Sequence, residues 1–360
     1  MQLNQKSKNV SMKAVDFFCG GGGMSYGMQE AGIDVLAGID YEIACKDTYE
    51  ANIINSKFIH ADVFELKVEA VQKELKLERN DDDLILIGCS PCQFWSIINT
   101  DKKKSEKSKS LLVEFERFVK FFNPGYVVVE NVPGVLKRKK ESGLEKFIFW
   151  LESNGFKVHF EIHNTHDFGV PQNRKRFTLV ASRIGDSQVF PKKVEDRKTV
   201  ADVLGVSNGF KKVKAGNRDK TEFLHTVSNI APITLKRLLK VRKNGGNRLD
   251  FADDPELQLP CFIGKDKSFM DTFGRLSWDK PANTITTKFY SVSNGRFVHP
   301  EENRALSLRE GATLQSFPKE YKFCGTNIGS IARQIGNAVP PEYARQIGLA
   351  IIENTQNGNF

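Results

Sequence analysis

The sequence has 360 residues, of which 40% are hydrophobic and 27% charged, and this composition is ordinary for a soluble globular protein. Its six cysteines are too few for a disulfide framework, and no apolar run approaches the roughly 18 residues that cross a bilayer. The formal net charge of +9 favours a polyanionic partner, nucleic acid or a membrane surface, although a merely soluble basic surface fits it equally well.

The polar N-terminal segment "MQLNQKSKNVSMK" does not resemble a signal peptide. We therefore expect a cytoplasmic protein that does not bind membranes.

Short apolar runs alternate with longer helical patterns through the first half of the chain. The runs predict strands at 14–18, 34–39, 57–61, 84–89, 126–130, 157–162 and 177–182. Their near-continuous apolarity suits strands buried on both faces. Helical patterns lie at 41–53, 65–76, 109–122 and 142–153. This alternation predicts an α/β fold with a doubly wound, mostly parallel sheet.

The composition of the sequence changes after about residue 184. Gly, Asn, Lys and Asp become frequent, as in "RKNGGNRLDFADDP" (242–255). We expect a second, smaller and irregular domain at 186–319, and a catalytic and cofactor-binding domain formed by 1–185 and 320–360. A final helix at 340–354 should pack on that first domain, because its apolar face needs a partner.

Ligands of open α/β sheets bind beyond the carboxyl ends of the strands. The first strand is followed by "CGGGG", and the next two by Asp40 and Asp62. Glycines allow close backbone approach, and an acid at such a place binds ribose hydroxyls. The pattern favours an adenosine-containing cofactor over a flexible turn with two solvated acids, but it lacks the spacing typical of NAD sites.

Two reactive side chains follow the next strands. Cys92, in "CSPCQFWS", is a candidate nucleophile, and Glu130, in "ENVPG", would be desolvated enough to hold a proton near neutral pH. A buried inert thiol and a salt-bridged acid are the alternatives. Cys89 and Cys92 form the one C-x-x-C pair, and without a second pair we predict no metal site.

Arginines precede the last predicted strand. Arg174 and Arg176 are two residues apart, so both guanidinium groups should point to one face, where they could hold a base edge or a phosphate.

These motifs, in this order, resemble those of the cytosine-5 DNA methyltransferase family. The segments that carry the resemblance are "DFFCGGGGMSYGMQEAG", "GIDYEIACKDTYEAN", "ADVFEL", "GCSPCQFWS", "ENVPGVL", "QNRKR", "RALSLREGATLQSFP" and "QIGNAVPP". The sequence departs from the family pattern at Gly21, Trp95, Gly311 and Thr313, none of which is a catalytic group.

The resemblance implies a Rossmann-like fold and S-adenosylmethionine as the cofactor, with S-adenosylhomocysteine as the product. The cofactor-binding residues it implies are Phe18, Gly20, Gly22, Gly23, Asp40, Tyr41, Asp62, Val63, Pro91, Leu111, Asn337 and Ala338. It also implies that Cys92 adds to C6 of a flipped-out cytosine while Glu130 binds N3, with Arg176 and Arg174 holding the base and its sugar-phosphate.

The implied partner is double-stranded DNA. The lysines at 101–109 would contact phosphates when a loop closes, and the basic segment 235–248 would lie in a target-recognition region. We expect a monomer from a restriction–modification system, with a separate endonuclease. A tRNA-directed enzyme of the same fold, a non-catalytic nucleic-acid binder, and a zinc or redox protein remain alternatives.

Overall fold

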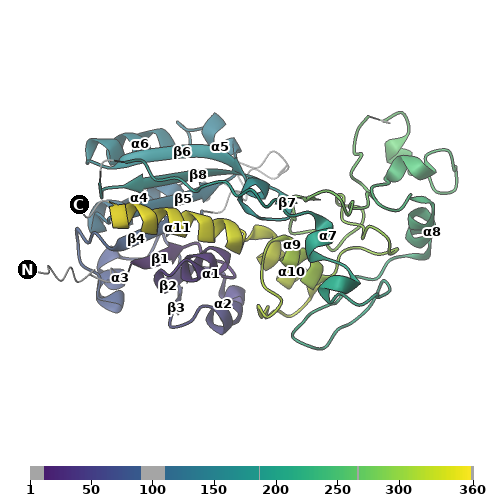
Figure 1. Ribbon diagram of the computed structural model, residues 1–360, viewed down its shortest axis with the longest axis horizontal. Coiled ribbons are helices and arrows are strands. Elements are labelled where there is room, and N and C mark those ends of the chain that lie inside the picture. Colours follow the sequence, from purple (N-terminus) through teal and green to yellow (C-terminus); the bar gives the residue numbers. More distant parts are fainter. Residues whose placement is uncertain (1–11, 91–109, 186, 266, 358–360) are drawn as a thin grey trace, which may run out of the picture.

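A computed structural model describes residues 12–90, 110–185, 187–265 and 267–357. Its largest element is a seven-stranded sheet with the order β3-β2-β1-β4-β5-β8-β6 (Figure 1). Strands β1 to β5 are parallel, and β8 is antiparallel to both of its neighbours. The strands are β1 (Lys13–Phe17), β2 (Asp34–Asp40), β3 (Lys57–His60), β4 (Leu84–Gly88), β5 (Tyr126–Asn131), β6 (Lys157–Asn164) and β8 (Lys175–Ser182). The predicted α/β sheet is confirmed.

Helices cover both faces of this sheet. Apolar side chains of α3 (Val68–Leu75), α4 (Leu111–Phe122) and α6 (Leu144–Ser153) pack on one face. On the other face lie α1 (Gly23–Glu30), α2 (Lys46–Asn52) and α11 (Pro341–Asn357), so the predicted packing of the last helix on the first domain is confirmed. Helices α1 and α11 approach so closely at Gly27 that a Cβ there would lie only 2.2 Å from the carbonyl oxygen of Pro341. The absence of a side chain at Gly27 allows this contact.

The prediction that every strand is buried on both faces is wrong for β6. Phe160 and Ile162 on this strand are 42% and 41% exposed. The reason is topological, since β6 is an edge strand and helices cover it only in part. The apolar run that predicted the strand carries no information about its place in the sheet.

Short elements link the sheet to the rest of the chain. Strand β7 (Gln172–Asn173) pairs in parallel with β9 (Ala282–Asn283), and neither was predicted. The remaining elements are α5 (Gly134–Lys137), α7 (Val200–Val203), α8 (Pro232–Lys240), α9 (Leu308–Leu314), α10 (Ile328–Asn337) and the 3-10 helices η1 (Ile43–Cys45), η3 (Thr165–Phe168), η4 (Val206–Asn208), η5 (Arg248–Phe251) and η6 (Pro260–Phe262). No helix within the described ranges is long and apolar enough to cross a membrane.

The segment between β8 and α11 forms the smaller part of the molecule (Figure 1) and has its own apolar clusters. One cluster joins α7, α9 and α10, and a second, outlying one contains Leu238 of α8 and Phe251 of η5. The first includes Tyr321, Phe323 and Ile335, so it extends past residue 319. The division into 1–185 with 320–360 and 186–319 stays a prediction.

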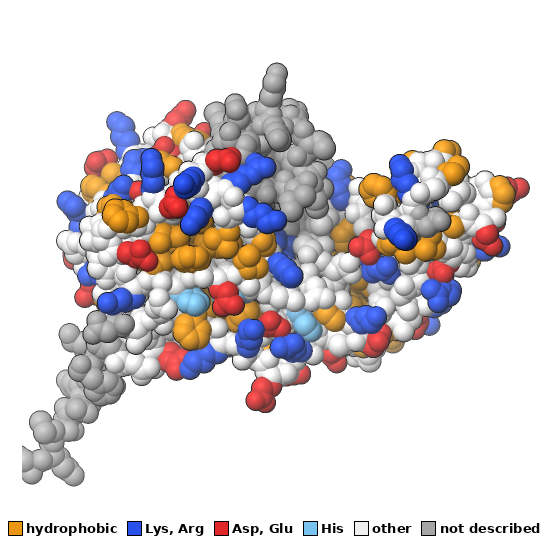
Figure 2. Space-filling model, turned by 90° about the horizontal axis from the view of Figure 1, so that it is seen from above, with side chains coloured by type: hydrophobic (Ala, Val, Ile, Leu, Met, Phe, Trp, Pro, Cys, Tyr) orange, Lys and Arg blue, Asp and Glu red, His pale blue; other side chains and the backbone are white. Residues whose placement is uncertain are grey.

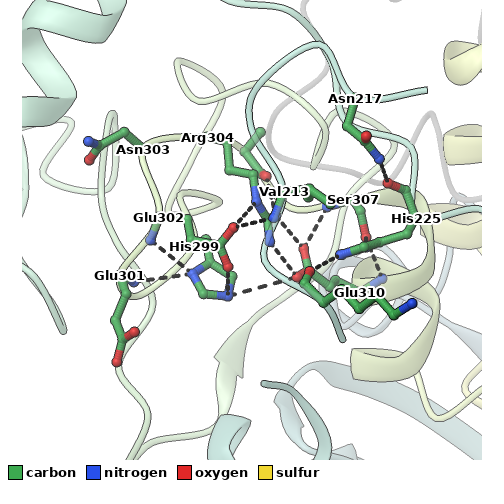
Figure 3. A network of polar contacts seen from close by, with 12 residues as sticks. Val213, Asn217, His225, His299, Glu301, Glu302, Asn303, Arg304, Ser307 and Glu310 are labelled. Atoms are coloured by element: carbon green, nitrogen blue, oxygen red, sulfur yellow. Dashed lines mark hydrogen bonds and ion pairs between the residues drawn. The ribbon is translucent and has the colours of Figure 1, made fainter. Parts of the chain in front are cut away.

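A buried polar network holds the start of α9 in the smaller part (Figure 3). Arg304 donates to both carboxylate oxygens of Glu310, at 2.7 and 2.8 Å. Glu310 also accepts the backbone N–H of Ser307, which closes a capping box at the N-terminus of α9. His299 lies 3.8 Å from the same carboxylate. Although burial alone would raise the pKa of Glu310, Arg304 lowers it from 4.5 to about 2.

We predict that Glu310→Gln lowers the free energy of unfolding by about 1.5–3 kcal/mol, because it removes two charged hydrogen bonds of the buried Arg304 and leaves this arginine with Glu302 Oε2, at 3.0 Å, as its carboxylate partner. The lowered pKa means that the carboxylate stabilises the fold fully above its ordinary pKa and loses this effect as the pH falls toward about 2. Urea denaturation as a function of pH measures both effects. The exposed Glu256→Gln is the control, and equal losses in the two variants would contradict the prediction.

Candidate functional site

The carboxyl ends of β1, β2, β4 and β5 meet at one edge of the sheet because these strands are parallel. The sequence places Phe18, Asp40, Ser90 and Glu130 at these ends. The residues predicted from strand ends therefore gather at a common edge, although they are up to 112 positions apart in the sequence.

The glycine loop is shaped by Asp40. Its carboxylate accepts the backbone N–H groups of Gly20 and Glu42, both at 2.8 Å. Gly22 has a φ of 86° and precedes α1, a conformation that disfavours residues with a Cβ. A Cβ at Gly23 would lie 2.3 Å from the carbonyl oxygen of Val339, whereas one at Gly20 would meet no described atom within 4 Å. The loop is thus tightly packed at Gly23, against Val339, and has free space among the described residues at Gly20.

A pocket lies beside this loop. Six of the predicted cofactor-binding residues line it, namely Phe18, Asp40, Tyr41, Asp62, Val63 and Leu111. Phe17, Ile39 and Ala61 complete the lining. Burial raises the pKa of the Asp40 carboxyl, against the effect of its two N–H donors. The pocket therefore combines apolar walls with two carboxylates.

The remaining predicted cofactor residues divide into two groups. Asn337 ends α10, and Ala338 lies next to the loop, since its Cβ is 3.2 Å from the Cβ position of Gly23. Pro91, like the predicted nucleophile Cys92 and the basic segment 101–109, falls outside the described residues.

Glu130 lies at the end of β5 and is only 7% exposed. Nε of Arg176, at the start of β8, is 2.8 Å from its Oε1. Burial raises the pKa of Glu130, and the charges of Arg176 and then Arg174 oppose this rise. The direction is the one that the apolar sequence before Glu130 predicts.

Arg174 has surroundings that its sequence spacing does not reveal. Its guanidinium donates to the carbonyl oxygens of Ile285 (3.0 Å), Gly336 (3.1 Å) and Ala338 (3.0 Å), and the residue is 2% exposed. It therefore connects the start of β8 to the smaller part and to the end of α10. Its predicted contact with the substrate stays a prediction.

Two further contacts at this edge were not predicted. The Asn131 side chain donates to Oγ of Ser90 at 3.1 Å, which ties the end of β5 to the residue after Cys89. Below the glycine loop, Ser25 donates to buried Asp16 at 2.6 Å, and burial raises the pKa of Asp16 to about 7. Asp16 could have been identified from the sequence, because it is an acidic residue within the apolar run of the first predicted strand.

One departure from the family pattern has a packing explanation. A Cβ at Gly311 would lie 2.2 Å from the ring of Phe289, so this ring occupies the space of a side chain. Nothing in the structure explains Thr313, whose hydroxyl is buried with no hydrogen-bond partner among the described residues. Trp95 lies outside the described ranges.

Known proteins resemble this chain over nearly its whole length. The family model "C-5 cytosine-specific DNA methylase" matches residues 12–353. The Type II methylase M.HgiDII of Herpetosiphon aurantiacus is 35% identical over 344 residues, covering 94% of each chain. The Type II methyltransferase M1.HphI of Haemophilus parahaemolyticus is 31% identical over 351 residues, covering 97% of this chain and 88% of that one.

A solved structure supports the fold independently. It is that of a prophage-encoded E. coli protein described as a DNA modification methyltransferase, with a TM-score of 0.73 at 24% identity, covering 96% of this chain and 100% of that one. At this identity the likeness concerns the fold alone. On the family match, the chain belongs to the C-5 cytosine-specific DNA methylase family and is a DNA (cytosine-5-)-methyltransferase.

Proposed function

We propose that the protein transfers the methyl group of S-adenosylmethionine to C5 of a flipped-out cytosine in a specific duplex sequence, through a covalent Cys92–C6 intermediate. The observation that carries the proposal is the contact of the buried Glu130 with Arg176, which lies at the same sheet edge as the pocket beside the glycine loop. A proton-holding carboxyl and a cofactor pocket at one edge are what this reaction requires.

The pocket suits an adenosine group. Phe18, Val63 and Leu111 offer apolar surface to a base, while Asp40 and Asp62 offer acceptors to hydroxyl and amino groups. Gly20 leaves space open toward the rest of the cofactor, since a Cβ there would meet no described atom within 4 Å. Bound here, S-adenosylmethionine supplies an electrophilic methyl group and leaves as S-adenosylhomocysteine.

The protein side chains would act on the cytosine ring. The thiolate of Cys92 adds to C6, and Glu130 shares its proton with N3, which favours the addition and makes C5 nucleophilic. Arg176 fixes the orientation of Glu130 and offers its other donors to the base. After methyl transfer, loss of the C5 proton allows the thiolate to leave.

We place the duplex DNA between the two parts of the molecule. Figure 2 shows a hollow there, with Lys and Arg side chains on its rim. The basic helix α8, with Arg237 and Lys240 in its last turn, belongs to the proposed target-recognition region. Phosphate contacts from such side chains would hold the duplex while the target base leaves the stack.

The names of the relatives place them among Type II methyltransferases. We extend this to the present chain as a monomeric modification enzyme, which protects DNA from a separate endonuclease. A tRNA substrate is the second candidate.

The first prediction from the proposed function concerns Cys92. With labelled S-adenosylmethionine, the wild-type protein should label duplex DNA but not tRNA, and Cys92→Ala should abolish transfer because it removes the thiol proposed to add to C6. Cys261→Ser, at an exposed cysteine, is the control and should retain activity. Label on tRNA alone, or unchanged transfer by the alanine variant, would refute the proposal. Bisulfite sequencing of the product then identifies the target site.

The second prediction concerns Glu130. Glu130→Gln should reduce single-turnover transfer by about 10²–10⁴-fold. Because transfer needs the protonated carboxyl, the rate should fall as the pH rises through the raised pKa of Glu130. Arg176 lowers this pKa, so Arg176→Ala should move the alkaline fall to higher pH as well as slowing the reaction.

The pH–rate profile of Arg183→Ala serves as the matched control. This arginine follows β8 at its other end and pairs with Asp82 at 2.7 Å. An alkaline limb that stays in place, or moves to lower pH, in Arg176→Ala would argue against the assigned role of Glu130.

The third prediction compares two neighbouring glycines. At φ 86°, Gly22→Ala should lower the free energy of unfolding by roughly 1–2 kcal/mol and weaken S-adenosylmethionine binding. Its Cβ would also lie 2.9 Å from the hydroxyl of Tyr321. At Gly21 a Cβ meets Gln334 at 3.3 Å and φ is not positive, so Gly21→Ala should stay within about 1 kcal/mol of wild type. Calorimetric titration showing equal affinities for the two variants would be inconsistent with the proposed loop.

A further inference from the structure

A histidine–glutamate–histidine set lies on the edge strand β6, far along the sheet from the glycine loop. His159, Glu161 and His163 alternate along the strand, so their side chains point to the same face. Each offers one ligand atom, and these atoms all lie within 4.8 Å of one another. None of the three residues takes part in the proposed methyl transfer.

The distances suit a small divalent metal ion. Oε2 of Glu161 is 3.3 Å from Nε2 of His163 and 3.9 Å from Nε2 of His159. Zinc–ligand bonds of 2.0–2.2 Å in a tetrahedron place neighbouring ligand atoms about 3.4 Å apart. The first distance matches this spacing, and a small rotation of the His159 ring would bring the second to it.

The surroundings of the histidines favour metal binding. Nδ1 of His163 contacts the hydroxyl of Tyr343 at 2.7 Å, which leaves Nε2 to face Glu161, and such an outer contact orients a metal-binding imidazole. Nε2 of His159 is buried and makes no hydrogen bond within the described part of the chain.

The access of solvent to the set and the charge around it also suit a bound metal ion. Glu161 is exposed, so the set opens to solvent on one side, where water can complete the coordination. Lys193 is one nearby cation, and it lies 3.6 Å from Asp167, which also pairs with Arg197 at 3.1 Å. Its charge is thus partly compensated before a metal ion arrives.

We propose that His159, Glu161 and His163 bind one divalent transition-metal ion, with Zn²⁺ as the ion that best fits two imidazoles, one carboxylate and an open position. Through Tyr343 of α11, which also contacts Thr178 of β8 at 2.6 Å, the ion would hold the edge strand β6 against the rest of the sheet. The prediction of no metal site rested on the cysteines, and it did not weigh this histidine spacing.

Zinc titration of the metal-free, full-length protein, made without a polyhistidine tag, tests the proposal. A competing chromogenic chelator reports the affinity and the number of ions. We expect one ion per chain at this set, with affinity reduced about tenfold or more in both Glu161→Gln and His159→Gln. The ion should raise the Tm of the wild-type protein and have little effect on either variant.

Matched controls separate this site from other zinc ligands. His166→Gln and Glu152→Gln change the same residue types outside the set, and both should bind zinc as the wild type does. Alkylation of accessible thiols should leave this ion in place. The proposal fails if the wild-type protein binds no zinc, if Glu161→Gln and His159→Gln bind it unchanged, or if the controls lose it equally. None of these readouts depends on methyl transfer.

Discussion

The buried guanidinium of Arg174 is the contact on which the arrangement of the two parts depends. It binds carbonyl oxygens from the segment after β9, through Ile285, and from the end of α10, through Gly336 and Ala338. Gln172 and Gln315 extend the same connection, with 2.7 Å between their side chains. A buried charge without hydrogen bonds is costly, so these segments must meet at Arg174. The position of the smaller part relative to the sheet edge follows from that requirement.

The same arginine belongs to the electrostatics of the site. Glu130 is buried, and burial raises its pKa, while the charges of Arg176 and Arg174 oppose the rise. The Glu130 carboxyl therefore holds its proton more tightly than an exposed glutamic acid does. Because Arg174 is also fixed by carbonyl groups of the smaller part, the assembly of the two parts and the proton affinity of Glu130 rest partly on one side chain.

The sequence predicts the sheet and much of the pocket, because both depend on local patterns. Apolar runs locate all seven long strands, and parallel strands bring residues such as Asp40 and Asp62 to one edge. The surroundings of Arg174 and the exposure of β6 depend instead on how distant segments are arranged. The carbonyl partners of Arg174 lie 111 to 164 residues away, and the exposure of β6 follows from its place in the strand order. The packing of the Phe289 ring on Gly311 also joins two separate segments, so the sequence alone does not predict it.

Strand β8 connects the features that the sequence presents separately. In its antiparallel pairing, Thr178 lies opposite both Glu130 of β5 and Glu161 of β6, and Arg176 lies opposite His163. Opposite residues of such a pair point to the same face, so Glu130, the proposed catalytic acid, and the histidine set share one face of the sheet, two strands apart. Tyr343 contacts both Thr178 and His163 on that face. His163 of β6 therefore lies directly opposite Arg176, the residue that contacts the buried Glu130.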